Sequence, residues 1–232
     1  MRVAVRRASA ELVGTAFLVA AVVGSGIMAT ELTDDVALQL LCNSLATGGA
    51  LVALILTLQP VSAAFNPVIT LVETLLGGIS WRDAGLCVLA QVVGGALGAV
   101  VANLMFDLDA VALSTTVRTG GGLWLAEVVA TVGLVLVVFG SIRAGRTETI
   151  AFAVGAYITA GYWFTSSTSV ANPAVGIARM FTDTFAGISP TSVPMFVLMQ
   201  LVGGALGLGL VRLLWPGLPS IPTSTPLSEE AR

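Results

Sequence analysis

The sequence predicts an all-α polytopic membrane protein with six membrane-spanning helices and two shorter, re-entrant half-helices, arranged as an inverted repeat. Of the 232 residues, 56% are hydrophobic and only 10% are charged, whereas soluble domains carry about 25% charged residues. The mean hydropathy is +0.97. The apolar sequence is also interrupted twice by the dipeptide Asn-Pro, and motifs around the first copy recur around the second. These three observations predict the architecture.

Six segments are apolar enough, over about 20 residues, to cross a bilayer. The first carries an acid, Glu11, and is too long for a cleavable signal peptide. The Asn-Pro segments follow the second and fifth spans, and each continues with too few apolar residues to cross. The full spans are expected at residues 8–29, 36–58, 84–106, 123–142, 150–164 and 193–214.

Each Asn-Pro segment predicts the start of a short helix. Proline is tolerated in the first turn of a helix, and the preceding Asn can cap that turn while an amide N–H stays available to donate. At membrane depth, the irregular lead-in must be shielded by protein or must line a watery cavity. The two copies are Ala64-Phe65-Asn66-Pro67-Val68 and Val170-Ala171-Asn172-Pro173-Ala174.

An internal repeat relates residues 8–106 to residues 123–214. Each half contains an acidic residue, a half-helix and a Gly-rich span, in that order. Because each half crosses the membrane three times, the second half enters from the opposite side, and the half-helices should meet near the midplane. The matching segments are Ala10-Glu11-Leu12-Val13 with Ala126-Glu127-Val128-Val129, and Gln91-Val92-Val93-Gly94-Gly95-Ala96-Leu97-Gly98 with Gln200-Leu201-Val202-Gly203-Gly204-Ala205-Leu206-Gly207.

Arginine sets the expected orientation, because the chain has no lysine. Only Arg118 and Arg179 fall on one side of the six-span arrangement, and the positive-inside rule makes the other side, with both termini, cytoplasmic. Residues 1–215 are expected to form one domain, and residues 216–232, rich in Pro and Ser, a disordered cytoplasmic tail. The arginines on the cytoplasmic side are Arg2, Arg6, Arg7, Arg82, Arg143, Arg146, Arg212 and Arg232.

The chain lacks the usual parts of an enzyme. It has no histidine, and no motif pairs a nucleophile with a base. Cys42 and Cys87 are spaced for neither a metal site nor a disulfide framework. We therefore predict no catalysis, no metal, no cofactor and no nucleic-acid partner.

With its doubled Asn-Pro motif in inverted repeats, the sequence over residues 8–214 resembles the major intrinsic protein family, the aquaporins and glycerol facilitators. The resemblance implies an aquaporin-like bundle with a pore in each protomer of a homotetramer in the lipid bilayer. Two helix N-termini pointing at the centre would repel cations, while the amides of Asn66 and Asn172 would donate to a passing hydroxyl. Small neutral hydroxylated solutes are the expected cargo.

Glu11 and Glu127 have two interpretations. They could be solvent-facing relay groups, or they could brace the lead-ins to the half-helices by accepting hydrogen bonds from backbone N–H groups. The resemblance favours bracing, as does the tendency of buried polar groups to be hydrogen-bonded.

The sequence departs from the family pattern at the expected selectivity constriction. Most members place Arg directly after the second Asn-Pro-Ala, where this chain has Val175. The usual bulky group of the second span is replaced by Thr47 or, with a different alignment of the lead-in, by Ala46. The matching positions are Ala160 or Gly161 on the fifth span and Ser169 on the re-entrant loop. A wide, uncharged and mildly polar constriction is expected from Thr47, Gly161, Ser169 and Val175.

Three segments resemble the bacterial branch of the family that is associated with arsenic resistance. They are the valine after Asn-Pro-Ala, the run Gly161-Tyr162-Trp163-Phe164-Thr165-Ser166-Ser167-Thr168-Ser169, and Thr182-Asp183-Thr184-Phe185-Ala186-Gly187-Ile188. This resemblance implies passive permeation of arsenous acid, or a related metalloid, across a bacterial inner membrane. A water or glycerol facilitator is the alternative. Val68 in the first motif leaves open a second alternative, a poorly conducting membrane scaffold.

Glu73 and Arg179 each stand seven residues after the Asn of their motif. At 1.5 Å per residue, both lie about 10 Å from the midplane, inside the hydrocarbon core. Neither charge can face lipid cheaply. They are expected to line the vestibules of the pore, or, for Arg179, to pair with Asp183 one turn on.

Overall fold

The computed structural model describes residues 2–216, and these residues form helices and loops without any β-strand. The predicted all-α bundle is confirmed. The tail predicted at residues 216–232 lies outside the described residues from 217 onward. The elements in chain order are α1 (Arg2–Leu32), α2 (Val36–Leu58), α3 (Pro67–Leu75), α4 (Trp81–Met105), α5 (Gly121–Arg143), η1 (Thr147–Thr149), α6 (Ile150–Phe164), α7 (Pro173–Ala178), η2 (Arg179–Phe181) and α8 (Val193–Leu214).

Five of the described helices, α1, α2, α4, α5 and α8, are long and apolar enough to cross a membrane. The sixth predicted span, α6, has 15 residues, or roughly 22 Å at 1.5 Å per residue. It is shorter than an average span because the chain becomes extended at Thr165, at the start of the Ser/Thr-rich lead-in to α7. One end of the sixth crossing is therefore completed by loop rather than by helix.

The repeat is visible in the packing of equivalent helices. In the first half α1 packs on α4, and in the second half α5 packs on α8. Glycines permit both contacts, as expected where membrane helices approach closely. A Cβ atom at Gly94 would lie 2.2 Å from the Leu12 carbonyl oxygen, and one at Gly203 would lie 2.8 Å from the Val128 carbonyl oxygen.

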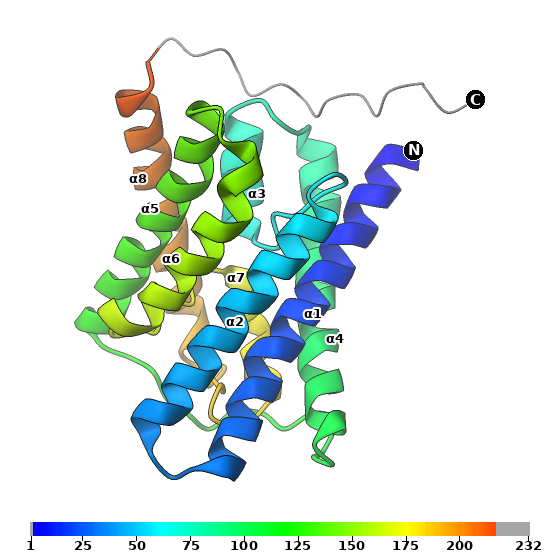
Figure 1. Cartoon of the computed structure of the whole chain (residues 1–232), viewed down its shortest axis with the longest axis vertical. Coiled ribbons are helices and arrows are strands. Elements are labelled where there is room, and N and C mark those ends of the chain that lie inside the picture. The colour runs from blue at the N-terminus through cyan, green and yellow to red at the C-terminus, as the bar shows by residue number, and fades with distance from the viewer. Residues whose placement is uncertain (1, 217–232) are drawn as a thin grey trace.

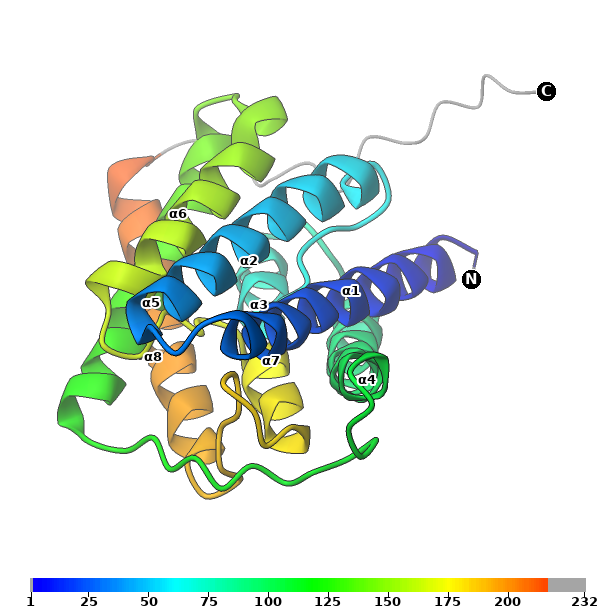
Figure 2. The same cartoon turned by 60° about the horizontal axis from the view of Figure 1, so that its bottom comes forward.

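The half-helices α3 and α7 lie in the middle of the bundle, one above the other in Figure 1, surrounded by the longer helices. Their N-terminal ends face each other, and the side chain of Asn66 reaches the backbone of Ala171 on the opposite half. The loop between α4 and α5 crosses the face of the bundle below α7 and α8 (Figure 2). We call this the loop face.

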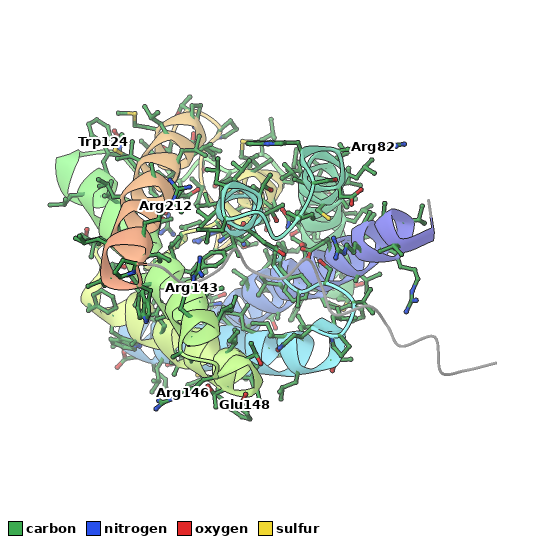
Figure 3. The ribbon with its side chains drawn as sticks, turned by 90° about the horizontal axis from the view of Figure 1, so that it is seen from above. Arg82, Trp124, Arg143, Arg146, Glu148 and Arg212 are labelled. Atoms are coloured by element: carbon green, nitrogen blue, oxygen red, sulfur yellow. The ribbon has the colours of Figure 1, made fainter. Side chains whose placement is uncertain are left out.

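The opposite end of the bundle carries the start of α1 and the end of α8 (Figure 1), and we call it the terminal face. Figure 3 looks onto this face, with Arg82 and Arg146 projecting at its rim. Arg212 on α8 donates from Nη2 to the carbonyl oxygen of Leu75, the last residue of α3 (3.1 Å). A cation at the C-terminus of a helix complements the helix dipole.

Candidate functional site: a pore between the half-helices

Both asparagines cap the half-helices that they precede. The Oδ1 atom of Asn66 accepts from the backbone N–H of Val68 (2.9 Å), and proline follows as the first helical residue of α3. The Oδ1 atom of Asn172 accepts from the N–H groups of Ala174 (3.0 Å) and Val175 (3.3 Å). An Asn cap satisfies donors that have no partner inside the helix.

The amide nitrogens of the same asparagines tie the two loops together. Asn66 Nδ2 donates to the Ala171 carbonyl (2.7 Å), and Asn172 Nδ2 donates to the Phe65 carbonyl (2.7 Å). An Asn amide has two N–H groups, so each side chain keeps a second donor. Since both residues also line the central cavity, that second donor is available to a solute at the crossing point.

The residue before each Asn adopts a left-handed backbone conformation, with φ of 48° at Phe65 and 46° at Ala171. Non-glycine residues in this region cost of order 1–3 kcal/mol each. The strain turns the chain sharply before each half-helix. It also directs the two carbonyl groups toward the asparagine of the opposite loop.

Glu11 and Glu127 hold these strained lead-ins in place. The Glu11 carboxylate accepts from the N–H groups of Ala64 (2.9 Å) and Phe65 (2.7 Å). Glu127 accepts from Val170 (3.0 Å) and Ala171 (2.9 Å). Both carboxylates are fully buried, and a buried carboxylate is tolerated when hydrogen bonds satisfy it.

A glutamine from the Gly-rich span of each repeat completes the network. Gln91 Nε2 donates to Glu11 (2.8 Å) and to the Thr70 hydroxyl (2.9 Å). Gln200 Nε2 donates to Glu127 (2.6 Å). Both glutamines belong to the Gly-rich segments that the repeat relates. The sequence signal for them is a polar side chain at the same position of both apolar Gly-rich spans.

A cavity with about 750 Å³ of space between protein atoms, including its open ends, runs past the paired asparagines. Its wall is mainly aliphatic and aromatic carbon, from Val22, Leu51 and Ile158 among others. A mainly apolar wall with few polar groups is typical of sites for small solutes. The polar side chains that line it are Thr47, Asn66, Tyr162, Thr168, Ser169, Asn172 and Arg179.

The cavity contains three of the four residues predicted for the constriction. Thr47, Ser169 and Val175 line it. Of the alternatives considered, Ala46 and Ala160 lie on exposed outer surfaces of their helices. Val68, from the first Asn-Pro motif, is buried against Gly204, where a Cβ atom would lie 2.5 Å from the Val68 Cγ1 atom.

Gly161 is not among the residues that line the cavity, and its place in the constriction stays a prediction. A Cβ atom at Gly161 would lie 2.6 Å from the Oγ and Cβ atoms of Ser169, so this glycine serves as a contact for the re-entrant loop. The wall at this level is formed by the next residue, Tyr162, whose hydroxyl lies 3.0 Å from the Thr47 Oγ1 atom. Tyr162 is outside the set of residues predicted for the constriction, although it is one of only two tyrosines in the chain.

Arg179 contributes a charged side chain to the wall of the cavity. The side chain is 5% exposed, and its Nε atom donates to the Ala186 carbonyl. Asp183, the alternative partner, instead accepts from the backbone N–H (2.9 Å) and the hydroxyl (3.1 Å) of Thr115. The cation is thus one helical turn beyond the position at which the family usually places it.

A second cavity opens toward the terminal face, where Glu73 and Arg7 both line it. Glu73 is partly buried on α3. The two predicted vestibule charges therefore belong to opposite ends of one path, Glu73 on the terminal side and Arg179 on the loop side. The two cavities adjoin, since both are lined by Ile55, Ala63, Ala64, Ile69, Val138 and Ile150.

This geometry defines a membrane pore that passes between two capped half-helices held head to head. A model of the family described as "Major intrinsic protein" matches residues 2–169, and the chain belongs to that family. It is a multi-pass membrane protein and a passive channel for small neutral solutes, not an enzyme. The predicted family resemblance is confirmed.

Similar proteins agree with this assignment. "Aquaglyceroporin AqpS" of Rhizobium meliloti (strain 1021) is 51% identical over 223 residues, covering 95% of each chain. "Aquaporin NIP1-1" of Zea mays is 27% identical over 229 residues, covering 95% of this chain and 80% of that protein. The X-ray structure of the aquaglyceroporin from Plasmodium falciparum matches with a TM-score of 0.71 at 18% identity, covering 92% of this chain and 98% of that chain. At 18% identity, the likeness to the Plasmodium falciparum structure shows the fold alone.

Proposed function

We propose that the channel carries trivalent arsenic as arsenous acid, or a related neutral metalloid hydroxide, down its concentration gradient. The observation that supports this most directly is Val175 in the wall of the cavity, where most family members have arginine. An uncharged, branched side chain leaves room for a solute larger than water. Arsenous acid is neutral at pH 7 and has three hydroxyl groups arranged rather like those of glycerol.

The polar groups of the cavity suit such a solute. The second N–H groups of Asn66 and Asn172 supply donors. The hydroxyls of Tyr162 and Thr47 can donate or accept, and the Ser169 hydroxyl is buried with no partner among the described residues. A triol that sheds water in an apolar pore needs both donors and acceptors, and this wall offers both.

A water and glycerol facilitator is the second candidate. The relative from Rhizobium meliloti carries the word aquaglyceroporin in its name, and glycerol presents a similar set of hydroxyls. A poorly conducting scaffold is the third candidate, although Val68, the residue that raised it, packs beside Gly204 and is not among the residues that line the cavity. Glycerol and arsenous acid must therefore be compared directly.

Flux into proteoliposomes tests the proposal through Val175→Arg. The native channel should pass arsenous acid and glycerol well above the lipid background. Because an arginine would fill and charge the wall, the variant should lose about tenfold or more of both fluxes, a barrier of ~1.4 kcal/mol, while water still passes. Val175→Met controls for size without charge. Unchanged arsenous acid flux in a folded Val175→Arg channel would remove Val175 from the constriction.

The orientation, the oligomeric state and the membrane of the channel are also proposals, and they rest on the distribution of arginine and on the family resemblance. The positive-inside rule makes the terminal face, with Arg82, Arg146 and Arg212, the cytoplasmic face. We propose that the chain forms a homotetramer, the assembly that the family resemblance implies, and that the homotetramer lies in a bacterial inner membrane. In that orientation Glu73 lies in the inner vestibule, and Arg179 lies in the outer one.

A further inference from the structure

Two arginines from distant parts of the chain are anchored to neighbouring carbonyls on the loop side of the bundle. Arg118 lies in the loop between α4 and α5, and Arg179 follows the half-helix α7. Arg118 Nη2 donates to the Phe185 carbonyl (3.4 Å), and Arg179 Nε donates to the carbonyl of the next residue, Ala186. Consecutive Cα atoms are about 3.8 Å apart, so the two guanidinium groups are anchored to neighbouring points of one loop.

No ion pair joins either guanidinium to a carboxylate among the described residues, although the buried Glu127 carboxylate acts electrostatically on both. Asp183, the nearest acid along the chain, is bound by Thr115. Glu127 is buried and occupied by the lead-in to α7 and by Gln200. Two like charges out of bulk water are unfavourable unless an opposite charge compensates them.

Each guanidinium also has spare donors. The Nε atom of Arg118 is buried and has no hydrogen-bond partner among the described residues. Arg179 is 5% exposed and lines the cavity, and the one hydrogen bond described for its side chain uses Nε. Its planar guanidinium therefore keeps N–H groups for a ligand in the cavity.

Arg118 is fixed in this position by its own loop. Its backbone N–H donates to the hydroxyl of Ser192, the residue before α8 (2.9 Å). Burial lowers the pKa of the Arg118 guanidinium, but arginine starts so high that it stays charged at neutral pH. The loop thus holds a permanent cation beside the mouth of the pore.

We propose that Arg118 and Arg179 form a binding site for a small oxyanion, such as phosphate, at the loop-face mouth of the pore. The oxygens of a tetrahedral oxyanion match the fork of a guanidinium group, and two such groups can hold one anion between them. The site rests on the proposed vestibule position of Arg179. A bound anion stands in the path of neutral solutes and slows their flux.

Inorganic phosphate is the probe, with chloride at equal ionic strength as the reference. A ligand that binds the folded state stabilises it, so phosphate should raise the unfolding temperature of the native channel in a saturable way. Arg118→Gln and Arg179→Gln should each weaken the apparent phosphate affinity about tenfold, or ~1.4 kcal/mol. Arg82→Gln, which removes a charge from the rim of the terminal face, should leave it unchanged.

Glycerol flux into proteoliposomes gives an independent readout, since phosphate should slow it over the same concentration range. If the Gln variants do not fold, Arg118→Lys replaces them. Lysine keeps the charge but lacks the planar guanidinium group, so this variant should bind phosphate more weakly than the native chain. The absence of a saturable phosphate effect, or equal effects in the native and substituted chains, would overturn the site. Phosphate binding without arsenous acid flux would instead defeat only the proposed substrate.

Discussion

At the scale of single residues, the wall of the pore depends on a pair of hydroxyl groups. The Tyr162 and Thr47 oxygens lie 3.0 Å apart, and either can be the donor. Whichever group donates, the other keeps its hydrogen for a solute, and lone pairs remain on both oxygens. The pair can therefore serve a solute hydroxyl as a donor or as an acceptor.

Tyr162→Phe should reduce glycerol and arsenous acid flux about fivefold relative to water flux, because one hydrogen bond of ~1 kcal/mol is lost from the path. Stopped-flow light scattering measures water and glycerol flux, and uptake of arsenous acid is assayed directly. Tyr157→Phe is the matched control. The Tyr157 hydroxyl donates to the Ala130 carbonyl (3.0 Å) and does not line the cavity. Equal flux ratios in both variants would show that the Tyr162 hydroxyl does not contact the solute.

At the scale of elements, glycines on the spans determine how closely the half-helices can approach. Gly95 on α4 lies beside α7, where a Cβ atom would be 3.1 Å from the Ala174 carbonyl oxygen. The equivalent Gly204 on α8 lies beside Val68 on α3. The bulkier valine of the first Asn-Pro motif therefore occupies the space that Gly204 leaves.

Gly204→Ala should destabilise the channel by about 1–3 kcal/mol through overpacking against Val68. The double variant Val68→Ala with Gly204→Ala should recover most of that loss, because the smaller residue at 68 makes room for the new methyl group. Gly209→Ala, on the same helix with no atom within 4 Å of the added Cβ, should not destabilise. Thermal unfolding of the purified protein measures all three. A Gly204→Ala loss that Val68→Ala does not rescue would refute the contact.

At the scale of the whole molecule, the two faces differ in charge. Arg146 and Arg212 lie toward the terminal face, whereas the loop face carries exposed acids such as Asp35 and Asp109. Charge asymmetry of this kind sets the direction of insertion, because arginine-rich segments stay in the cytoplasm.

Labelling with a membrane-impermeant maleimide tests this orientation in a chain with Cys42→Ser and Cys87→Ser. A cysteine at exposed Glu148 on the terminal face should react only after the cells are permeabilised. Asp109→Cys on the loop face should react in intact spheroplasts. The reverse pattern would place the termini outside and would put Arg118 and Arg179 at the cytoplasmic mouth.

The sequence by itself determined the membrane class, the inverted repeat, the two half-helices and the family. These features depend on local rules: spans need about 20 apolar residues, proline begins helices, and repeated motifs are visible without coordinates. The caps at Asn66 and Asn172 belong to the same category, since a capping side chain acts on its own first turn.

Only the tertiary structure decided which side chains face the pore. Successive helical residues point about 100° apart, so a shift of one position replaces Gly161 with Tyr162 in the wall. No amphipathic pattern marks the correct face, because α6 is apolar nearly throughout and packs on both α2 and α5. The anchoring of Arg118 and Arg179 on one loop was equally invisible in the sequence. It depends on two distant segments being folded onto the consecutive carbonyls of Phe185 and Ala186.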